Sequence, residues 1–254
     1  MSHTFAIKGA RLLFAKELKA WRAMTLRLPG KAAPKPAAGT LYAYSPAVLP
    51  KPGDWAPEVL VTGYWFLDSP DWRPDEALES FLRAGPAPVY FGFGSMPGIE
   101  PAAMTGMILE ALEMTGKRGL LAGGGGAIGK VDASARAFFL SSAPHDRLLP
   151  RTSAAIHHGG AGTTAASLRA GLPTQIIPFF GDQPFWGRRV GALGAGPLPL
   201  DRRTLSAAGL ANALAAMDSA AIRGRAADLG TAIGREHGVE AATSFLERLS
   251  LRSG

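Results

Sequence analysis

Short apolar segments alternate with longer helical segments along the chain from residue 87 onward. Five segments predict buried strands, at residues 88–91, 117–122, 138–140, 154–156 and 174–178. The other stretches have helical periodicity, and helices are expected at about 100–116, 163–170, 185–193, 204–217, 219–236 and 239–249. Strands that alternate with helices build a parallel sheet with both faces covered. This alternation predicts an α/β fold with a doubly wound parallel sheet.

Composition removes several classes of function. The chain has 254 residues and no cysteine, which excludes a disulfide scaffold, a thiolate metal site and a cysteine nucleophile. Its 47% hydrophobic content supports a packed core, and no apolar run approaches the ~18 residues of a transmembrane helix. The net charge of +7 arises within residues 1–36, because the rest of the chain is neutral. Neither a nucleic-acid partner nor a metal is expected.

The basic N-terminal segment predicts an amphipathic helix over residues 5–28. Charged residues interrupt its apolar stretch, so a secretory signal is not expected. A cytoplasmic location is expected instead. Five residues at helical spacing form the predicted apolar face: Phe14, Leu18, Trp21, Thr25 and Leu28. Such a helix either packs on a neighbouring protein or makes peripheral contact with an anionic membrane.

Residues 29–101 contain 13 of the 20 prolines. Proline lacks a backbone N–H and fixes φ, so much of this stretch can be neither helix nor central strand. Its several tyrosines and tryptophans indicate that it packs against something. One short helix is expected after Pro74 and ends at Gly85. We interpret the stretch as a linker or a loop-rich wrap.

A glycine-rich turn, His157 to Thr164, follows the strand expected at 154–156. The unpaired N–H groups and the dipole at the start of the next helix favour an anion there. The glycines let a phosphate approach the backbone, and Thr163 and Thr164 can donate hydroxyl groups. His158 is interpreted as a further donor and His157 as a structural residue.

Two other turns after strands carry polar groups. Gly92 to Ser95 follows the first strand, and Ser95 offers a hydroxyl and an N–H to a ligand; the alternative is a tight turn that needs positive φ. Asp182 stands next to Gln183 after the last strand. A carboxylate beside a carboxamide suits recognition of neighbouring hydroxyl groups, although Asp182 could instead only cap a helix.

The segment Gly124–Gly129 satisfies the glycine pattern of dinucleotide-binding turns. No long apolar helix follows it, and no strand about 20 residues later ends in an acidic residue. A nicotinamide or flavin cofactor is therefore not expected.

Four segments together resemble the UDP-glycosyltransferase family (glycosyltransferase families 1 and 28), and within it the sterol and macrolide glucosyltransferase-like branch. They are Val89–Met96, Ala143–Pro150, His157–Thr164 and Pro178–Trp186. Their order and spacing agree with the family over about residues 41–245. The family has the GT-B architecture of two Rossmann-like domains with the active site between them, and the C-terminal domain holds the nucleotide sugar.

The resemblance implies a domain organisation and a set of binding residues. Residues 1–40 would be a basic-helix remnant of the acceptor domain, 41–86 a Pro-rich interdomain linker, and 87–254 the nucleotide-sugar-binding Rossmann-like domain. The diphosphate would be held by Ser95, His158, Gly160, Gly162, Thr163 and Thr164. The nucleobase would face Ala143, Pro144 and His145, and the sugar hydroxyls would face Asp182 and Gln183.

The implied reaction is inverting hexosyl transfer from a UDP-sugar, with UDP-glucose as the expected donor, to a hydroxylated lipophilic acceptor such as a sterol or a polyketide. No cofactor is implied. The general base is expected in the N-terminal domain of the family, of which this sequence resembles only the last helix. Activity would then need a separate acceptor-domain chain or a second copy. The alternative is a catalytically silent module that binds a nucleotide sugar.

Overall fold

The computed structural model describes residues 9, 12–29, 37–94, 96, 100–123, 126–129 and 135–252. The chain divides into two compact units, Met1–Thr40 and Leu41–Gly254. Among the described helices, none combines the length and the apolar character that crossing a membrane requires.

The first unit contains one described helix of appreciable length, α2 (Ala15–Met24), and all its side chains are at least partly exposed. Phe14, Leu18 and Trp21 are each about half exposed, at 53%, 45% and 52%. The helix stops before Arg27, whose φ of 52° lies in the left-handed region and ends the helical path. The prediction of a helix over 5–28 is therefore wrong at its C-terminal end, and its residues 5–8, 10 and 11 lie outside the described part of the chain.

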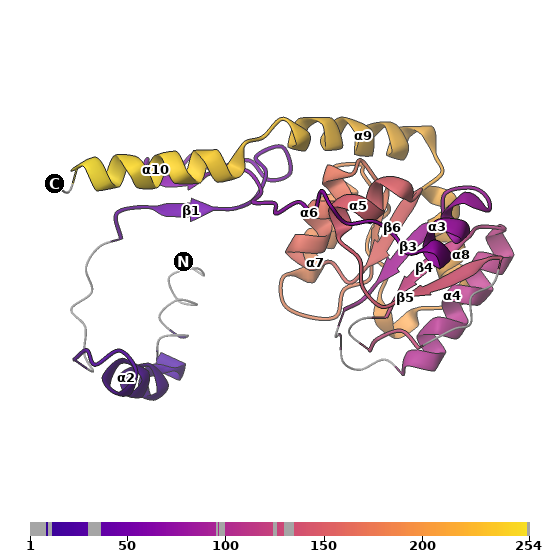
Figure 1. The fold of residues 1–254 in the computed structure, drawn as a ribbon, viewed down its shortest axis with the longest axis horizontal. Coiled ribbons are helices and arrows are strands. Elements are labelled where there is room, and N and C mark those ends of the chain that lie inside the picture. The colour runs from indigo at the N-terminus through magenta and orange to yellow at the C-terminus, as the bar shows by residue number, and fades with distance from the viewer. Residues whose placement is uncertain are drawn as a thin grey trace. The chain divides into compact units, whose positions relative to one another are not determined.

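The second unit is built on a five-stranded parallel sheet with helices on both faces (Figure 1). The order across the sheet is β5-β4-β3-β6-β7. The strands are β3 (Val89–Gly92), β4 (Gly119–Ala122), β5 (Ala137–Leu140), β6 (Ala154–His157) and β7 (Thr174–Ile176). The predicted α/β doubly wound sheet is confirmed, and all five strands lie where the apolar segments predicted them.

The helices of this unit follow the predicted positions within a few residues, except the four-residue α5, for which no helix was predicted. They are α3 (Glu76–Arg83), α4 (Pro101–Thr115), α5 (His145–Leu148), α6 (Ala161–Arg169), α7 (Gln183–Ala192), α8 (Ala207–Ala216), α9 (Ala220–Gly234) and α10 (Gly238–Arg252). Local sequence explains several starts: the Asp75 carboxylate accepts from the N–H of Leu78 at α3, and the Ser206 hydroxyl accepts from the N–H of Gly209 at α8.

The two faces of the sheet pack against different helices because side chains alternate along each strand. On β3, Val89 and Phe91 belong to a core cluster that includes residues of α4 and α8, and these two helices pack against each other. Tyr90, between them, belongs to a cluster with residues of α3. Burial on both faces is what a parallel sheet requires, and it explains the continuously apolar strands.

Residues 41–86 belong to the same compact unit as the sheet. A strand pair lies at the start of this stretch, with β1 (Thr40–Tyr42) beginning one residue before it and β2 (Val59–Val61) within it. Val48 and Tyr64 are buried in a cluster with residues of α6, α7 and α9. The Pro-rich stretch therefore wraps the sheet domain, although the boundary between linker and domain at residue 87 stays a prediction.

Arg118, just before β4, fastens three segments of the second unit to one another. Its guanidinium donates to the main-chain carbonyls of Phe81, Pro86 (3.0 Å) and Ala135 (3.2 Å). It also lies 4.1 Å from the centroid of the Phe81 ring. The side chain is buried, so these bonds replace those that the guanidinium would make with water.

Replacing Arg118 with methionine should lower the free energy of unfolding by about 2–4 kcal/mol, because three carbonyls lose their donor. Urea unfolding measures the change. Arg223→Met on the surface of α9 is the matched control and should stay within about 0.5 kcal/mol of the parent. An equally small loss for Arg118→Met would contradict this account of the contact.

Candidate functional site

The order of the strands locates the site. The chain leaves β3 toward one edge of the sheet to build β4 and β5, and later returns on the other side of β3 to build β6 and β7. Ligands of such sheets bind outside the carboxyl ends of the strands, where this reversal occurs. Here the reversal lies between β3 and β6, which end at the paired residues Gly92 and His157. The residues that follow these two strands form the candidate site.

The glycines after β6 keep the start of α6 open. Gly159 has a φ of +89°, and a Cβ there would lie 2.6 Å from Ile176 Cγ2. Gly160 is the N-cap of α6 and supplies no side-chain cap, and a Cβ there would lie 2.6 Å from His158 Nε2. The first N–H groups of a helix have no partner within the helix. At α6 they are left accessible to an anion.

His158 lies between the turns that follow β3 and β6. Its Nδ1 is 3.5 Å from the carbonyl oxygen of Gly92, and a Cβ on Gly160 would press against its Nε2. Burial lowers the pKa of His158, while the Gly92 carbonyl and the nearby Asp182 carboxylate act in the opposite direction. An anion bound beside this ring would favour its protonated form.

A pocket of about 250 Å³ lies at the carboxyl end of the sheet. It brings together the predicted residues His158 and Thr163 from one segment of the chain and Ala143 and His145 from another. Thr164 is different, because its hydroxyl donates to the carbonyl of Gly160 (2.9 Å) inside the helix and the residue is fully buried.

His145, at the start of α5, is held in place by a residue of the sheet. Its Nε2 lies 3.1 Å from the Tyr90 hydroxyl, and the two rings meet edge to face. The Tyr90 hydroxyl reaches the end of the sheet over Gly92, where a Cβ would lie 2.3 Å from its oxygen. Burial raises the pKa of Tyr90 to about 12 and lowers that of His145, so this pair is a neutral hydrogen bond at neutral pH.

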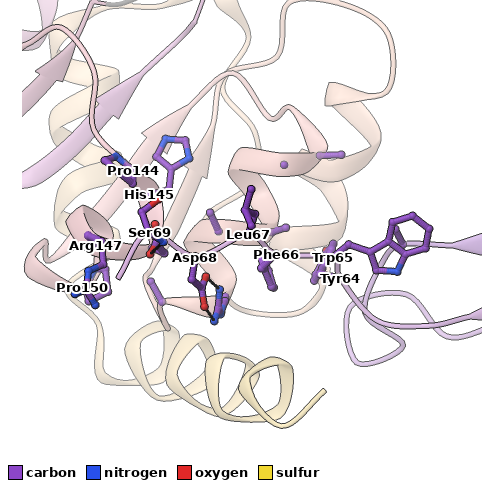
Figure 2. A pocket seen from close by; sticks show the side chains of 18 of the residues that line it. Tyr64, Trp65, Phe66, Leu67, Asp68, Ser69, Pro144, His145, Arg147 and Pro150 are labelled. Carbon is purple, nitrogen blue, oxygen red and sulfur yellow. Dashed lines mark hydrogen bonds and ion pairs between the residues drawn. The ribbon is translucent and has the colours of Figure 1, made fainter. Parts of the chain in front are cut away.

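A larger cavity of about 1130 Å³ adjoins α5 and α6 (Figure 2). On one side are α5 and α6, including Pro144, His145 and Gly162, which were predicted as site residues. On the other side runs the segment 64–70, which we call the strap. No role was predicted for the strap from the sequence, apart from the packing of its aromatic residues in a Pro-rich stretch.

Polar contacts fasten the strap to α5 and α6. The Asp68 carboxylate accepts two hydrogen bonds from the Arg169 guanidinium, at 2.5 and 2.7 Å. The N–H of Ser69 donates to Asp146 Oδ2 (2.8 Å), and Arg147 donates to the carbonyl of Pro70. The strap is thereby a fixed wall of the cavity.

The carboxylate and the carboxamide expected to face sugar hydroxyls are partly engaged within the chain. Asp182 is exposed, and its Oδ2 accepts from Trp186 Nε1 (2.8 Å) instead of capping α7. Gln183 is buried, and its Oε1 accepts from the N–H groups of Phe179 (2.7 Å) and Phe180 (3.2 Å). Their role toward a sugar stays a prediction, with Asp182 Oδ1 the more available group.

Two further observations complete the site. Ser95, predicted to contact the diphosphate, lies outside the described residues, as do Gly124 and Gly125 of the rejected dinucleotide pattern. Within the described part of the chain, no three His, Asp or Glu side chains gather closely enough to hold a metal ion.

Known glycosyltransferases resemble this chain in sequence. Residues 129–234 match the family model described as the C-terminal domain of erythromycin biosynthesis protein CIII-like proteins. The chain is 44% identical to a sterol 3-beta-glucosyltransferase of Arabidopsis thaliana, over 82% of this chain and 33% of the relative. It is 42% identical to O-mycaminosyltylonolide 6-deoxyallosyltransferase of Streptomyces fradiae, over 82% of this chain and 49% of the relative. The chain thus spans a third to a half of these relatives.

Solved structures agree on the fold. The spinosyn forosaminyltransferase superposes with a TM-score of 0.70 at 18% identity, over 96% of this chain and 66% of that one. This likeness identifies the second unit as the Rossmann-like C-terminal half of a GT-B fold.

His157, the residue before His158, gives a test of the site's packing. It is fully buried, and its Nδ1 accepts from the N–H of Gly159 (3.0 Å). Burial lowers its pKa to about 3, against an ordinary value of 6.5. Below about pH 6.5 this histidine binds a proton in the unfolded chain but stays neutral in the folded chain. The free energy of unfolding therefore falls as the pH is lowered, by up to about 1.4 kcal/mol per pH unit.

Urea unfolding at several pH values between about 7 and 5 should show this slope, and His157→Gln should reduce it. His237→Gln, a surface variant on the turn before α10, is the control and should keep the slope of the parent. A slope that His157→Gln leaves unchanged would show that this ring is not held neutral by burial.

Proposed function

We propose that this chain, which corresponds to the C-terminal portion of a UDP-glycosyltransferase, binds the UDP-sugar donor for transfer of a hexose to a hydroxylated lipophilic acceptor. The observation that carries the proposal is the open N-terminus of α6 at the point where the strand order reverses. His158 stands beside this helix start. The larger cavity is lined by Gly162 of its first turn, and the smaller pocket by His158 and Thr163.

The diphosphate is the part of the donor that this corner suits best. The N–H groups at the start of α6 and the positive end of the helix dipole attract negative charge. His158 and the Thr163 hydroxyl border the same pocket. When the bond from the sugar to the diphosphate breaks, charge grows on the departing oxygen. Well-placed donors at such a position contribute about 3–4 kcal/mol each to lowering the barrier.

The remaining groups of the donor extend from the diphosphate in two directions. The nucleobase would lie against the backbone of Ala143, Pro144 and His145, whose loop is held by Tyr90. The hexose, with glucose as the expected sugar, would lie toward Asp182 and Gln183, close to His158. The Asp182 carboxylate is near enough to His158 to oppose the lowering of its pKa by burial, and this nearness supports adjacent sugar and diphosphate positions.

The reaction also needs an acceptor and a base. The acceptor hydroxyl oxygen would form a bond to C1 of the sugar from the face opposite the diphosphate, while the bond from C1 to the diphosphate oxygen breaks and the hydroxyl proton passes to a general base. The names of the relatives, a sterol glucosyltransferase and a macrolide-type deoxyallosyltransferase, support a lipophilic acceptor. We assign no described residue as the base, so the acceptor side would come from other residues, a separate chain or a second copy.

This lack of an assigned base among the described residues also favours a second candidate, a module that binds a nucleotide sugar without turning it over. Mixing the chain with UDP-glucose and a sterol separates the two. Transfer that appears only when an acceptor domain of a relative is added supports the donor half of an enzyme. Binding without transfer under both conditions supports the silent module.

Calorimetry with UDP tests the diphosphate position. His158→Ala should weaken binding about 10- to 100-fold, because a hydrogen bond to a charged group contributes about 1.5–3 kcal/mol. Thr163→Ala should act in the same direction. His237→Ala, far along the chain on an exposed turn, is the control. Unchanged affinity in both site variants would remove this assignment.

Gly160→Ala tests the glycine-cleared backbone separately from the imidazole. The added Cβ would lie 2.6 Å from His158 Nε2 and displace the ring, so UDP affinity should fall about tenfold or more. Gly224→Ala in α9 is matched, because nothing lies within 4 Å of its Cβ, and it should stabilise the helix by up to about 1 kcal/mol without altering UDP affinity. Equal UDP affinity in the two variants would contradict the account.

A further inference from the structure

The cavity between the strap and α6 has walls of different chemistry. Gly162, Ala165 and Ala166 line it from α6, and these side chains offer no hydrogen-bonding group. Arg169 follows on the same helix, about 10 Å along the axis from Gly162 at 1.5 Å per residue. The strap on the opposite side brings aromatic surface and the Asp68 carboxylate. A ligand with hydroxyl groups would find its acceptors on the strap and not on the helix.

The Asp68 carboxylate is fixed and charged. Both of its oxygens accept hydrogen bonds from Arg169, and these bonds lower the pKa of Asp68. Arg169 is itself held, because its guanidinium lies 4.3 Å from the centroid of the Phe66 ring. The Asp68 side chain keeps 48% of its surface exposed, and each oxygen retains a free lone pair. Asp68 can therefore accept from a ligand without leaving Arg169.

The second carboxylate of the cavity has a different task. Asp146 Oδ2 accepts from the backbone N–H of Ser69 and so holds the strap against α5. Arg147, next to it, donates to the carbonyl of Pro70. Asp68 is exposed whereas Asp146 is only partly exposed, so Asp68 is the carboxylate better placed to meet a ligand.

We propose that this cavity holds the nucleoside part of the donor, and that Asp68 accepts hydrogen bonds from the ribose hydroxyls and so selects ribonucleotides over 2′-deoxyribonucleotides. This inference rests on the proposed binding of a UDP-sugar. The cavity opens onto Gly162 in the first turn of α6, where the diphosphate is proposed to bind, and onto His145 of the nucleobase loop. Its volume of about 1130 Å³ is ample for a base and a ribose.

Calorimetry with UDP and with 2′-deoxy-UDP on the full chain tests this role. The parent should bind UDP about 10- to 100-fold more tightly, since the two ligands differ only in the 2′-hydroxyl. Asp68→Asn should reduce that ratio to about threefold or less. The ratio of the two affinities is the readout, because a loosened strap would weaken the binding of both ligands alike. Asp71→Asn, an exposed acid just after the strap that does not line the cavity, is the control and should keep the ratio of the parent.

Each other outcome counts against the proposal. A parent that binds the two ligands equally, or an Asp68→Asn variant that keeps the ratio of the parent, overturns it. Loss of the preference in Asp146→Asn but not in Asp68→Asn overturns it in favour of the other carboxylate. If the parent binds neither ligand, the proposed function itself fails, and this inference fails with it.

Discussion

Unpaired amide groups at the start of α6 are the feature on which the rest of the site depends. A helix start can attract an anion only if nothing in the chain occupies it, and two glycines meet that condition here. Gly159 takes a left-handed conformation in a crowded place, and Gly160 leaves room for the ring of His158. Side chains at these positions would collide with Ile176 or His158, so the open corner follows directly from the absence of Cβ atoms.

The parallel sheet brings that corner to the other binding groups. Because β3 and β6 are neighbours, the turns that follow them meet, although they are more than 60 residues apart in the sequence. Tyr90 on β3 reaches His145 on α5, which fixes the loop at residues 143–145 that is proposed to face the nucleobase. The Pro-rich stretch then closes the outer side through the strap. Core packing and site geometry therefore share the same strands.

Much of this was predictable from the sequence, and the exceptions have physical causes. Apolar segments predicted every strand of the five-stranded sheet, and the turn at 157–164 predicted the open helix start. The strands β1 and β2 were not predicted, because they lie in the Pro-rich stretch that was interpreted as a linker or a loop-rich wrap. The end of α2 was missed because a left-handed Arg27 leaves no pattern. Thr164 and Gln183 carry suitable groups, but burial directs them inward. The strap was missed because the ion pair of Asp68 with Arg169 joins residues 101 positions apart, which periodicity cannot reveal.

The most direct test of the central claim is a crystal structure of the chain with UDP bound. The account predicts that the diphosphate oxygens lie within hydrogen-bonding distance of the first N–H groups of α6 and of His158, with the nucleoside extending toward His145. A diphosphate bound elsewhere on the sheet, or an α6 start still occupied only by solvent or by a side chain of the protein, would contradict it.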